Sequence, residues 1–400
     1  MIEAQKILKK VLPVTPLLRS QVLTDLLDRD VFLKCENVQR TGSFKARGAY
    51  WRIHRLSAEE RTRGVVAASA GNHAQGVALA ASRLGISATV VMPKTAALPK
   101  VAATERYLGP GQQVVLHGKT VADAIKHAEN MAKDRDSVFI HPYDHEDVIA
   151  GQGTVGLEIA KECPRVKTVV VPVGGGGLAA GIAVALADHK STPKVVGVQA
   201  EACAAYPNSL LRRRPVKITY RPTIADGIAV TRPGDIPLGI LLSRQVPVLT
   251  VSEDTLYKAL ILCLEQAKQL VEPAGVAAFG ALLEHKDDFE FEPPVVVVLS
   301  GGNIDTLLLA DLLRHGWPAA GRVLTFRCRL ADQPGSLARL LNEVGKMGAN
   351  LVDMTPQRVA PELPFHQADV HMQLETKGEQ HRKEVIEHLE GKGFKLDEVS

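Results

Sequence analysis

The sequence is poor in aromatic residues and in clustered charge. Phe, Trp and Tyr supply only 4% of its 400 residues, so a large core must consist mainly of aliphatic side chains. Such a composition suits sheets that are buried on both faces. The net charge is +4 and the only short basic run is residues 212–214, so neither nucleic acid nor a membrane surface is indicated as a partner. Hydrophobic residues reach 46%, enough for two or three domains.

Paired cysteines and long apolar segments are also lacking. The five cysteines are odd in number and contain no CxxC pattern, which indicates small buried thiols in a reducing compartment rather than a disulfide framework. The first residues, MIEAQKILKKVLPVTPLL, contain neither a long apolar run nor a small-residue cleavage site. We therefore expect no signal peptide and no membrane span, and a cytoplasmic protein.

Short aliphatic runs alternate with longer helix-like segments through most of the chain. This alternation predicts an α/β fold with a mainly parallel sheet. The strand candidates are VFLKCE at 31, GVVAAS at 64, ATVVMP at 88, TVVVPV at 168, KVVGVQA at 194, VPVLTV at 246 and PVVVVLS at 294. Helices are expected after residues 74, 255 and 273, the second of them capped by Ser252.

The pattern changes at HGWPAAG, residues 315–321, where Pro and Gly interrupt it. We expect a first domain over 1–316, a linker over 317–321 and a small domain over 322–400. In the small domain, apolar residues alternate from 324 to 330, recur at helical spacing from 337 to 344 and alternate again from 368 to 374. With NLVDM, EQHRKEVIEHLEG and FKLDEV, the order becomes βαββαβ, the ferredoxin-like unit.

A strand followed by four glycines and an apolar helix, TVVVPVGGGGLAAG, is the strongest local signal. Bare backbone N–H groups at a helix amino terminus can hold a phosphate. The stretch also satisfies G-x-G-x-x-A through Gly174, Gly176 and Ala179, so a dinucleotide site remains an alternative, with Glu201 as a weak candidate for the ribose acid. A tight structural turn is the third interpretation.

Three further motifs gain meaning only together. Lys45 follows Phe44 at the expected start of a helix, with Ser43 as a candidate cap; ASAGNHAQG at 68–76 places a glycine turn between a strand and a helix; and Ser300 in LSGGN ends a strand, where ligands of open α/β sheets bind. Each motif alone has an ordinary explanation as a cap, a turn or a solvated lysine.

In this order the four motifs resemble those of the tryptophan-synthase-β-like, fold type II pyridoxal phosphate enzymes, and most closely the threonine and serine dehydratases. The resemblance covers about residues 5–315. It implies a two-lobed catalytic domain of open parallel sheets, with a small lobe of about residues 50–150 inserted in the large lobe. It also implies pyridoxal 5'-phosphate as the cofactor and a homodimer or homotetramer.

The resemblance assigns a role to each matched position. Lys45 matches the Schiff-base lysine, Phe44 the residue beside the ring and Asn72 the partner of the ring hydroxyl. Ser300 matches the hydroxyl that contacts the pyridine nitrogen. The phosphate loop is Gly174, Gly175, Gly176, Gly177 and Leu178. The turn expected to receive the substrate is Ser69, Ala70, Gly71, Asn72 and His73, although His73 taken alone is more typical of a structural residue.

The implied reaction removes water and then ammonia from L-threonine to give 2-oxobutanoate, and converts L-serine to pyruvate. A serine or 3-hydroxyaspartate dehydratase or a racemase on the same cofactor is the nearest alternative. Serine racemases carry a second serine where this chain has Ala70, which favours elimination. Some relatives bind a divalent cation through a Glu and an Asp six residues later; here the pair is Glu201 and Pro207, so a tight Mg²⁺ site is not expected. A monovalent cation held by backbone carbonyls is left open as an alternative. An NAD-dependent oxidoreductase and a catalytically idle amino-acid sensor are the alternatives from other classes.

The terminal unit, with DQPGSLARLL at 332–341 and GANLVDM after it, resembles ACT domains. The resemblance implies allosteric control by an amino acid such as isoleucine or valine, with a role in isoleucine biosynthesis among the possibilities. The implied effector residues are Asp332, Pro334, Gly335, Ser336, Leu337 and Asn350. A purely structural dimerisation module is the alternative.

Overall fold

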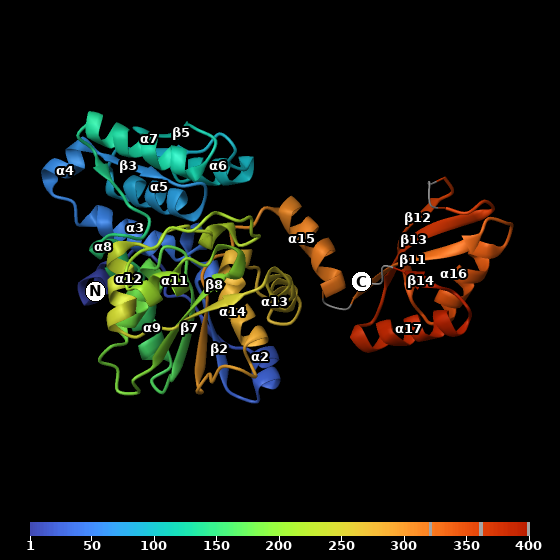
Figure 1. The fold of residues 1–400 in the computed structure, drawn as a ribbon. Helices are drawn as coiled ribbons and strands as arrows, with labels where there is room; N and C mark the ends of the chain where they lie inside the picture. Colours follow the sequence, from blue (N-terminus) through green and yellow to red (C-terminus); the bar gives the residue numbers. More distant parts are fainter. Residues whose placement is uncertain (320–321, 360–362, 398–400) are drawn as a thin grey trace. The chain divides into compact units, whose positions relative to one another are not determined.

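The computed structural model describes residues 1–319, 322–359 and 363–397. The chain divides into two compact units, Met1–Asp305 and Thr306–Ser400 (Figure 1). The first unit contains two separate sheets, and the second contains one.

The larger sheet of the first unit has six strands. Their order is β1 (Leu17–Arg19), β2 (Val31–Cys35), β10 (Val295–Leu299), β7 (Thr168–Pro172), β8 (Lys194–Ala200) and β9 (Val248–Val251). Only β1 runs antiparallel to its neighbour. The valine runs of β7 and β10 are fully buried because helices cover both faces. Since β7 and β10 are parallel neighbours, the segments that follow them emerge at the same edge of the sheet.

Helices cover this sheet on both sides. Helix α14 (Pro273–Glu284) packs against β7, β8, β9 and β10. The opposite face is covered by α9 (Thr154–Glu162), α10 (Gly177–Ala185) and α12 (Asp235–Ser243), which share one apolar cluster with strand residues such as Val169 and Val296.

The smaller sheet has four parallel strands in the order β5 (Gln112–Leu116), β4 (Ala88–Met92), β3 (Val65–Ala68) and β6 (Val138–Phe139). Helices α3 (Lys45–His54) and α5 (Asn72–Leu84) pack in the apolar cluster on one face, and α7 (Val121–Asp134) covers the other. Figure 1 shows α3 and α8 (Glu146–Gln152) between the two sheets of the first unit. The helix that begins at Lys45 thus lies where the two sheets meet.

Further helices complete the first unit. They are α1 (Ile2–Leu8), α2 (Gln21–Leu27), α4 (Ala58–Arg63), α6 (Leu98–Glu105), α11 (Tyr206–Arg212) and α13 (Glu253–Glu265), with single 3-10 turns at η1 (Glu36–Val38), η2 (Arg40–Gly42), η3 (Glu201–Cys203) and η4 (Asp226–Ile228). Among the described residues, no helix combines the length and apolar character needed to cross a membrane.

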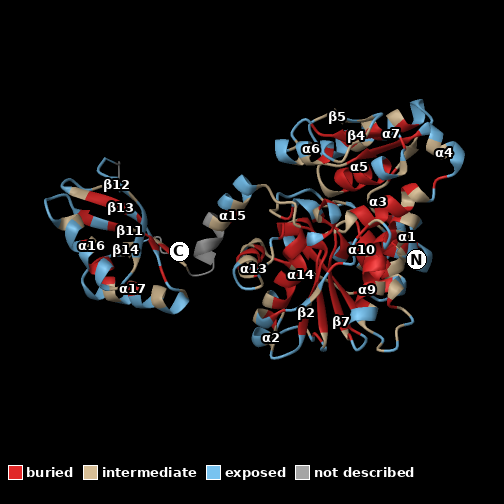
Figure 2. Cartoon of the chain, turned by 180° about the vertical axis from the view of Figure 1, so that it is seen from behind, coloured by how far each residue is buried: buried red, intermediate tan, exposed pale blue. Residues whose placement is uncertain are grey.

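The second unit consists of α15 (Thr306–Ala319), β11 (Val323–Ala331), α16 (Ser336–Lys346), β12 (Asn350–Gln357), β13 (Gln367–Glu375), α17 (Glu379–Gly391) and β14 (Leu396–Asp397). The sheet order is β12-β13-β11-β14, with every pairing antiparallel. The apolar residues that alternate along β11 and β13 form a buried cluster with α16 and α17 (Figure 2). The predicted βαββαβ order is confirmed over the described residues; the end of the last predicted strand lies outside them.

All seven strands predicted from aliphatic runs in the first unit are present, and Ser252 accepts a hydrogen bond from the Thr255 N–H as expected of a cap. The sequence did not reveal β1, β5 and β6, which are short or only partly buried and therefore lack a continuous apolar run. Helix α15 continues through residues 315–319, where Pro and Gly suggested a break. It groups with the second unit, although the sequence placed residues 306–316 in the first domain.

Candidate active site

Lys45 is the first residue of α3, as predicted, and its side chain points toward the loop that follows β6. Its Nζ donates a hydrogen bond to the Pro142 carbonyl at 3.0 Å and lies 5.1 Å from the centre of the Phe44 ring. The expected cap by Ser43 is wrong: Phe44 occupies the N-cap without a side-chain bond, and the buried Ser43 hydroxyl has no partner among the described residues. Ser43 instead pairs with Gly301 through its backbone.

Burial changes the acidity of the Lys45 amine. Removal from water lowers its pKa to about 8, although the negative charge of Glu272 acts in the opposite direction. A substantial fraction of the amine is therefore neutral near neutral pH, the form that can attack a carbonyl or accept a proton.

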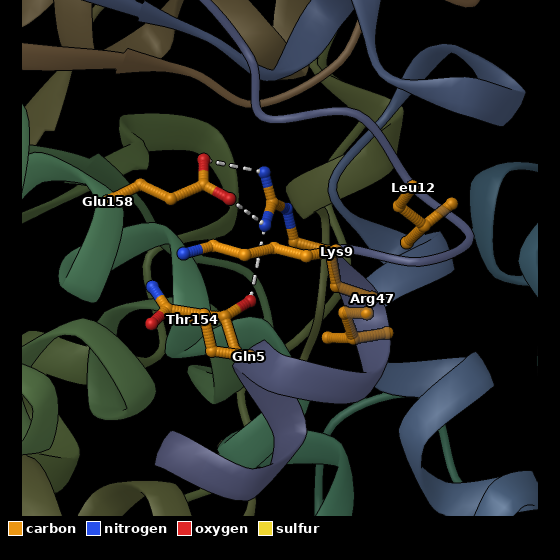
Figure 3. Close-up of a pocket in the computed structure, with 7 residues that line it drawn as sticks. Gln5, Lys9, Leu12, Arg47, Thr154 and Glu158 are labelled. Atoms are coloured by element: carbon orange, nitrogen blue, oxygen red, sulfur yellow. Dashed lines mark hydrogen bonds and ion pairs between the residues drawn. The ribbon is translucent and has the colours of Figure 1, made fainter.

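A buried ion network anchors α3 at Arg47, two residues after Lys45, and Figure 3 shows the contacts of Arg47 with Glu158 and Thr154. The Arg47 guanidinium donates to both carboxylate oxygens of Glu158 at 2.7 and 2.9 Å and to the Thr154 hydroxyl at 3.2 Å. It also donates twice to Glu36 at 2.8 Å. Arg47 is 2% exposed, so these bonds fix α3 against α9 and η1 in a low-dielectric environment.

The glycine loop connects the end of β7 to α10. Gly176 has φ +99°, which favours glycine, and a Cβ there would overlap the Tyr206 hydroxyl. A Cβ at Gly175 would overlap the Tyr143 ring. Tyr206 donates to the Gly175 carbonyl at 3.0 Å and so stabilises the conformation of the loop. Leu178 is buried in the first turn of α10, whose free N–H groups favour an anion.

The loop after β6 contacts both Lys45 and the glycine run. The Pro142 carbonyl that accepts from Lys45 also accepts from Gln152 Nε2 at 3.4 Å. Gln152 Oε1 lies where a Cβ of Gly177 would be, and within the described residues this buried oxygen has no hydrogen-bond partner. A polar atom left unpaired beside a glycine cradle is consistent with a site that receives a polar ligand.

The asparagine turn precedes α5, which begins at Asn72 with Gly71 as its N-cap. The Ser69 hydroxyl accepts from the Gly71 N–H at 3.1 Å and stabilises the turn rather than capping the helix. Ala70 stands between them, partly exposed. His73 is buried, its Nε2 lies 2.9 Å from the Ile140 carbonyl, and burial lowers its pKa to about 3. His73 is therefore a neutral structural residue.

Ser300 directly follows β10 and is 4% exposed. Its carbonyl accepts from the Phe44 N–H at 3.2 Å, which ties the strand end to the segment that carries Lys45. The structure therefore gathers the lysine, the asparagine turn, the glycine loop and the strand-end serine around one site.

The sequence did not indicate Glu272, which precedes α14 as its N-cap. It is 7% exposed and accepts from Asn72 Nδ2 at 2.6 Å. Burial is the main cause that raises its pKa to about 7, with the Asp226 charge adding to the effect. Asn303 was also missed, although it closes the LSGGN motif. A Glu before a Pro at a helix start, and an Asn after two glycines, were the only signals available.

The predicted effector residues lie at two ends of the second unit. The turn of Asp332, Pro334, Gly335, Ser336 and Leu337 follows β11, where Ala331 pairs with Gln367. Asn350 pairs with Glu375 at the opposite end of β13 and donates to its carboxylate at 3.4 Å. The structure does not bring the two parts together within one unit.

A buried lysine and a glycine cradle between two open parallel sheets define an α/β enzyme site built for a phosphorylated, carbonyl-bearing cofactor. The chain matches the family model described as pyridoxal-phosphate dependent enzyme over residues 9–301, and it belongs to this family. The dinucleotide alternative is not retained.

Similar proteins have related activities. The chain is 43% identical over 394 residues to an L-threonine ammonia-lyase of Thermotoga maritima, covering 98% of this chain and 97% of the relative. A threonine deaminase structure from Solanum lycopersicum, the processed form of isoform 2, is 33% identical with a TM-score of 0.73, covering 78% of this chain and 86% of that one. A maize serine racemase structure is 30% identical with a TM-score of 0.73, covering 78% and 96%.

Proposed function

We propose that this protein deaminates L-threonine to 2-oxobutanoate and ammonia with pyridoxal 5'-phosphate, and acts on L-serine to give pyruvate. The carrying observation is the buried Lys45 amine, which has a depressed pKa and donates to the Pro142 carbonyl in the loop that also contacts the glycine run through Tyr143. The near full-length similarity to an L-threonine ammonia-lyase supports the choice of substrate.

The residues present fit the cofactor. The glycine loop leaves space that a Cβ would fill, and the amino terminus of α10 favours the charge of a phosphate. Lys45 supplies the amine for covalent attachment, Phe44 lies beside it, and Ser300 is a neutral group for the pyridine nitrogen. Bound pyridoxal phosphate would supply the electron sink for charge that develops at the substrate α-carbon.

Proton transfer is the task of Lys45. Lys45 would hold the cofactor through Nζ, and the free, neutral Nζ would accept the α-proton of the substrate as a general base. The turn of Ser69, Ala70 and Gly71 at the start of α5 receives the substrate carboxylate, because exposed N–H groups and the helix dipole favour an anion there. The buried ion network behind α3 keeps Nζ in place during both roles.

Two variants test this assignment. Lys45→Ala should lose both the visible absorption that borohydride abolishes and the turnover of threonine, because no other amine replaces Nζ. Lys126→Ala, an exposed lysine on α7, should leave both unchanged. Full dehydratase activity in Lys45→Ala would refute the proposal. Parallel measurement of kcat/KM for threonine, serine and 3-hydroxyaspartate then ranks the substrates.

Racemisation is the alternative that a solved structure favours, because a serine racemase has the same fold at 30% identity. Racemisation needs a proton donor on the second face of the α-carbon, and Ala70 offers none. We expect Ala70→Ser to increase the formation of D-serine relative to pyruvate. Equal D-serine formation by the wild type and Ala70→Ser would contradict this reasoning.

We infer that residues 322–400 form an ACT regulatory domain that binds isoleucine or valine. The sheet order β12-β13-β11-β14 supports this inference. Along β13, the end near Asp332 and the end near Asn350 are separated by roughly 26 Å at the usual rise per strand residue. A site that uses both residues therefore requires a second copy of the chain, which agrees with a homodimer or homotetramer.

Calorimetric titration of the full chain with isoleucine and valine tests the effector site. Asp332→Ala and Asn350→Ala should each abolish binding, whereas Gln373→Ala, on the same sheet, should bind normally. Mixed oligomers of the two deficient chains should regain part of the binding, because one interface then contains both residues. Binding that survives in both variants would exclude this site.

We also propose a cytoplasmic location. All five cysteines are free and buried, as suits a reducing compartment. To test this, the folded protein is isolated with its accessible thiols blocked. A thiol signal that grows to five per chain only after unfolding would agree with this location.

A further inference from the structure

Three turns from distant parts of the sequence meet at the Asn72 side chain. The Asn303 amide nitrogen donates one hydrogen to the Thr41 carbonyl at 2.5 Å and another to Asn72 Oδ1 at 2.8 Å. Thr41 precedes Gly42, which has φ +68° and whose missing Cβ leaves room for the Asn303 amide. The segment leading to Lys45 is therefore shaped to accept Asn303.

These bonds determine which way the Asn72 amide faces. A backbone carbonyl can only accept, so the Asn303 nitrogen must face Thr41 and its second hydrogen is available only for Asn72 Oδ1. Asn72 Nδ2 consequently lies on the other side, where it donates to Glu272 Oε1 at 2.6 Å. One N–H of Asn72 remains for a ligand.

Glu272 is itself held in place. Its backbone N–H donates to the Gly301 carbonyl at 3.0 Å, and a Cβ at Gly301 would overlap its carboxylate. The charged groups that act on it are Lys45 from α3, Lys100 from α6 and Asp226 from η4. Lys100 is paired with Asp226 at 2.7 Å, whereas Lys45 donates its hydrogen bond to the Pro142 carbonyl.

We propose that Asn303 and Glu272 are positioning residues of the cofactor site. Asn303 fixes the Asn72 amide against the Thr41 carbonyl, and the Glu272 carboxylate holds its nitrogen, so that the remaining N–H of Asn72 is directed at the ring oxygen of pyridoxal phosphate. This inference rests on the proposed function only in the contact between Asn72 and the cofactor, and it is independent of which amino acid is the substrate.

The visible spectrum of the bound cofactor, recorded without substrate, tests the proposal. Asn303→Ala and Glu272→Leu should shift the absorption maximum in the same direction as Asn72→Ala, because each frees the Asn72 amide. Glu272→Gln keeps an acceptor for Asn72 Nδ2 and should return the spectrum toward wild type. With threonine, Asn303→Ala should lower kcat about tenfold, the effect of one hydrogen bond, with little change in KM.

Asn37→Ala is the matched control. Asn37 is a buried asparagine whose amide bonds to Gln269 and the Leu270 carbonyl rather than to Asn72. It should leave the spectrum unchanged even if stability falls. If Asn303→Ala does not fold, Asn303→Asp keeps the shape and removes the donor, so the same spectral shift is expected.

Two results would overturn the proposal: an unchanged spectrum in Asn303→Ala and Glu272→Leu when Asn72→Ala does shift, or an equal shift in Asn37→Ala. A chain that shows the expected spectra but does not turn over threonine would refute the proposed substrate alone.

Discussion

The depressed pKa of Lys45 predicts how the protein without cofactor captures pyridoxal phosphate. Attachment requires the neutral amine, and burial lowers the pKa of Nζ from 10.5 to about 8. At pH 7.5 about a quarter of such an amine is neutral, against about 0.1% for an ordinary lysine, so the reactive fraction rises roughly 200-fold.

The assay is the pH dependence of covalent capture. Cofactor-free protein is mixed briefly with pyridoxal phosphate at each pH, reduced with borohydride and digested, and the modified fraction of each lysine is measured by mass spectrometry. Capture at Lys45 should reach a plateau with a midpoint near pH 8. Modification of a lysine-containing reference peptide, whose amine has the ordinary pKa, should continue to increase toward about pH 10 in the same samples.

The variant Glu272→Gln tests what sets the pKa of Lys45. The Glu272 charge raises the pKa of Lys45 against the effect of burial, so its removal should move the midpoint below 8. Capture at Lys45 that follows the same pH curve as the reference peptide would refute the claim that burial controls this amine. A midpoint unchanged by Glu272→Gln would remove Glu272 from the explanation.

Three further predictions concern the structure around the site. Arg47→Met should reduce the free energy of unfolding by about 3–5 kcal/mol in urea titration, because it leaves the buried Glu36 carboxylate without its cation and leaves Glu158 with Lys34 alone. Arg63→Met, which breaks an exposed pair with Asp136, should lose less than about 1 kcal/mol, and equal losses would contradict the argument. Gly176→Ala should weaken cofactor binding in equilibrium dialysis, since its φ is +99° and its Cβ would overlap Tyr206, whereas Gly239→Ala, with no atom nearby and inside α12, should bind normally. The pKa of Glu272 is raised to about 7, so the folded protein retains a proton that the unfolded chain releases above about pH 4.5. The stability of the cofactor-free wild type relative to Glu272→Gln should therefore fall by about 3 kcal/mol between pH 4 and pH 8. Parallel pH–stability curves of the two proteins would be inconsistent with the burial of this carboxyl.

The local sequence determined most of the secondary structure, because strands buried on both faces must be aliphatic along their length. It is for this reason that β7 and β10 were recognisable while the half-exposed β5 was not. The glycine run was likewise readable, since a tight turn with positive φ restricts residue types locally. The helix start at Lys45 was located as well, although the cap predicted at Ser43 is absent. Proline and glycine at 315–319 were misleading, because α15 continues through them to Ala319.

Only the tertiary structure revealed what surrounds these motifs. Glu272 and Asn303 contact Asn72 from positions 200 and 231 residues away in the sequence. The helical and strand periodicity of the sequence does not indicate contacts over such a separation. The pKa of Lys45 and the anchoring of its helix by Arg47 depend in the same way on burial and on carboxylates from other elements. The sequence by itself determined which groups could do the chemistry; the packing of two sheets around α3 decided their protonation and orientation, because both depend on distance and desolvation in three dimensions.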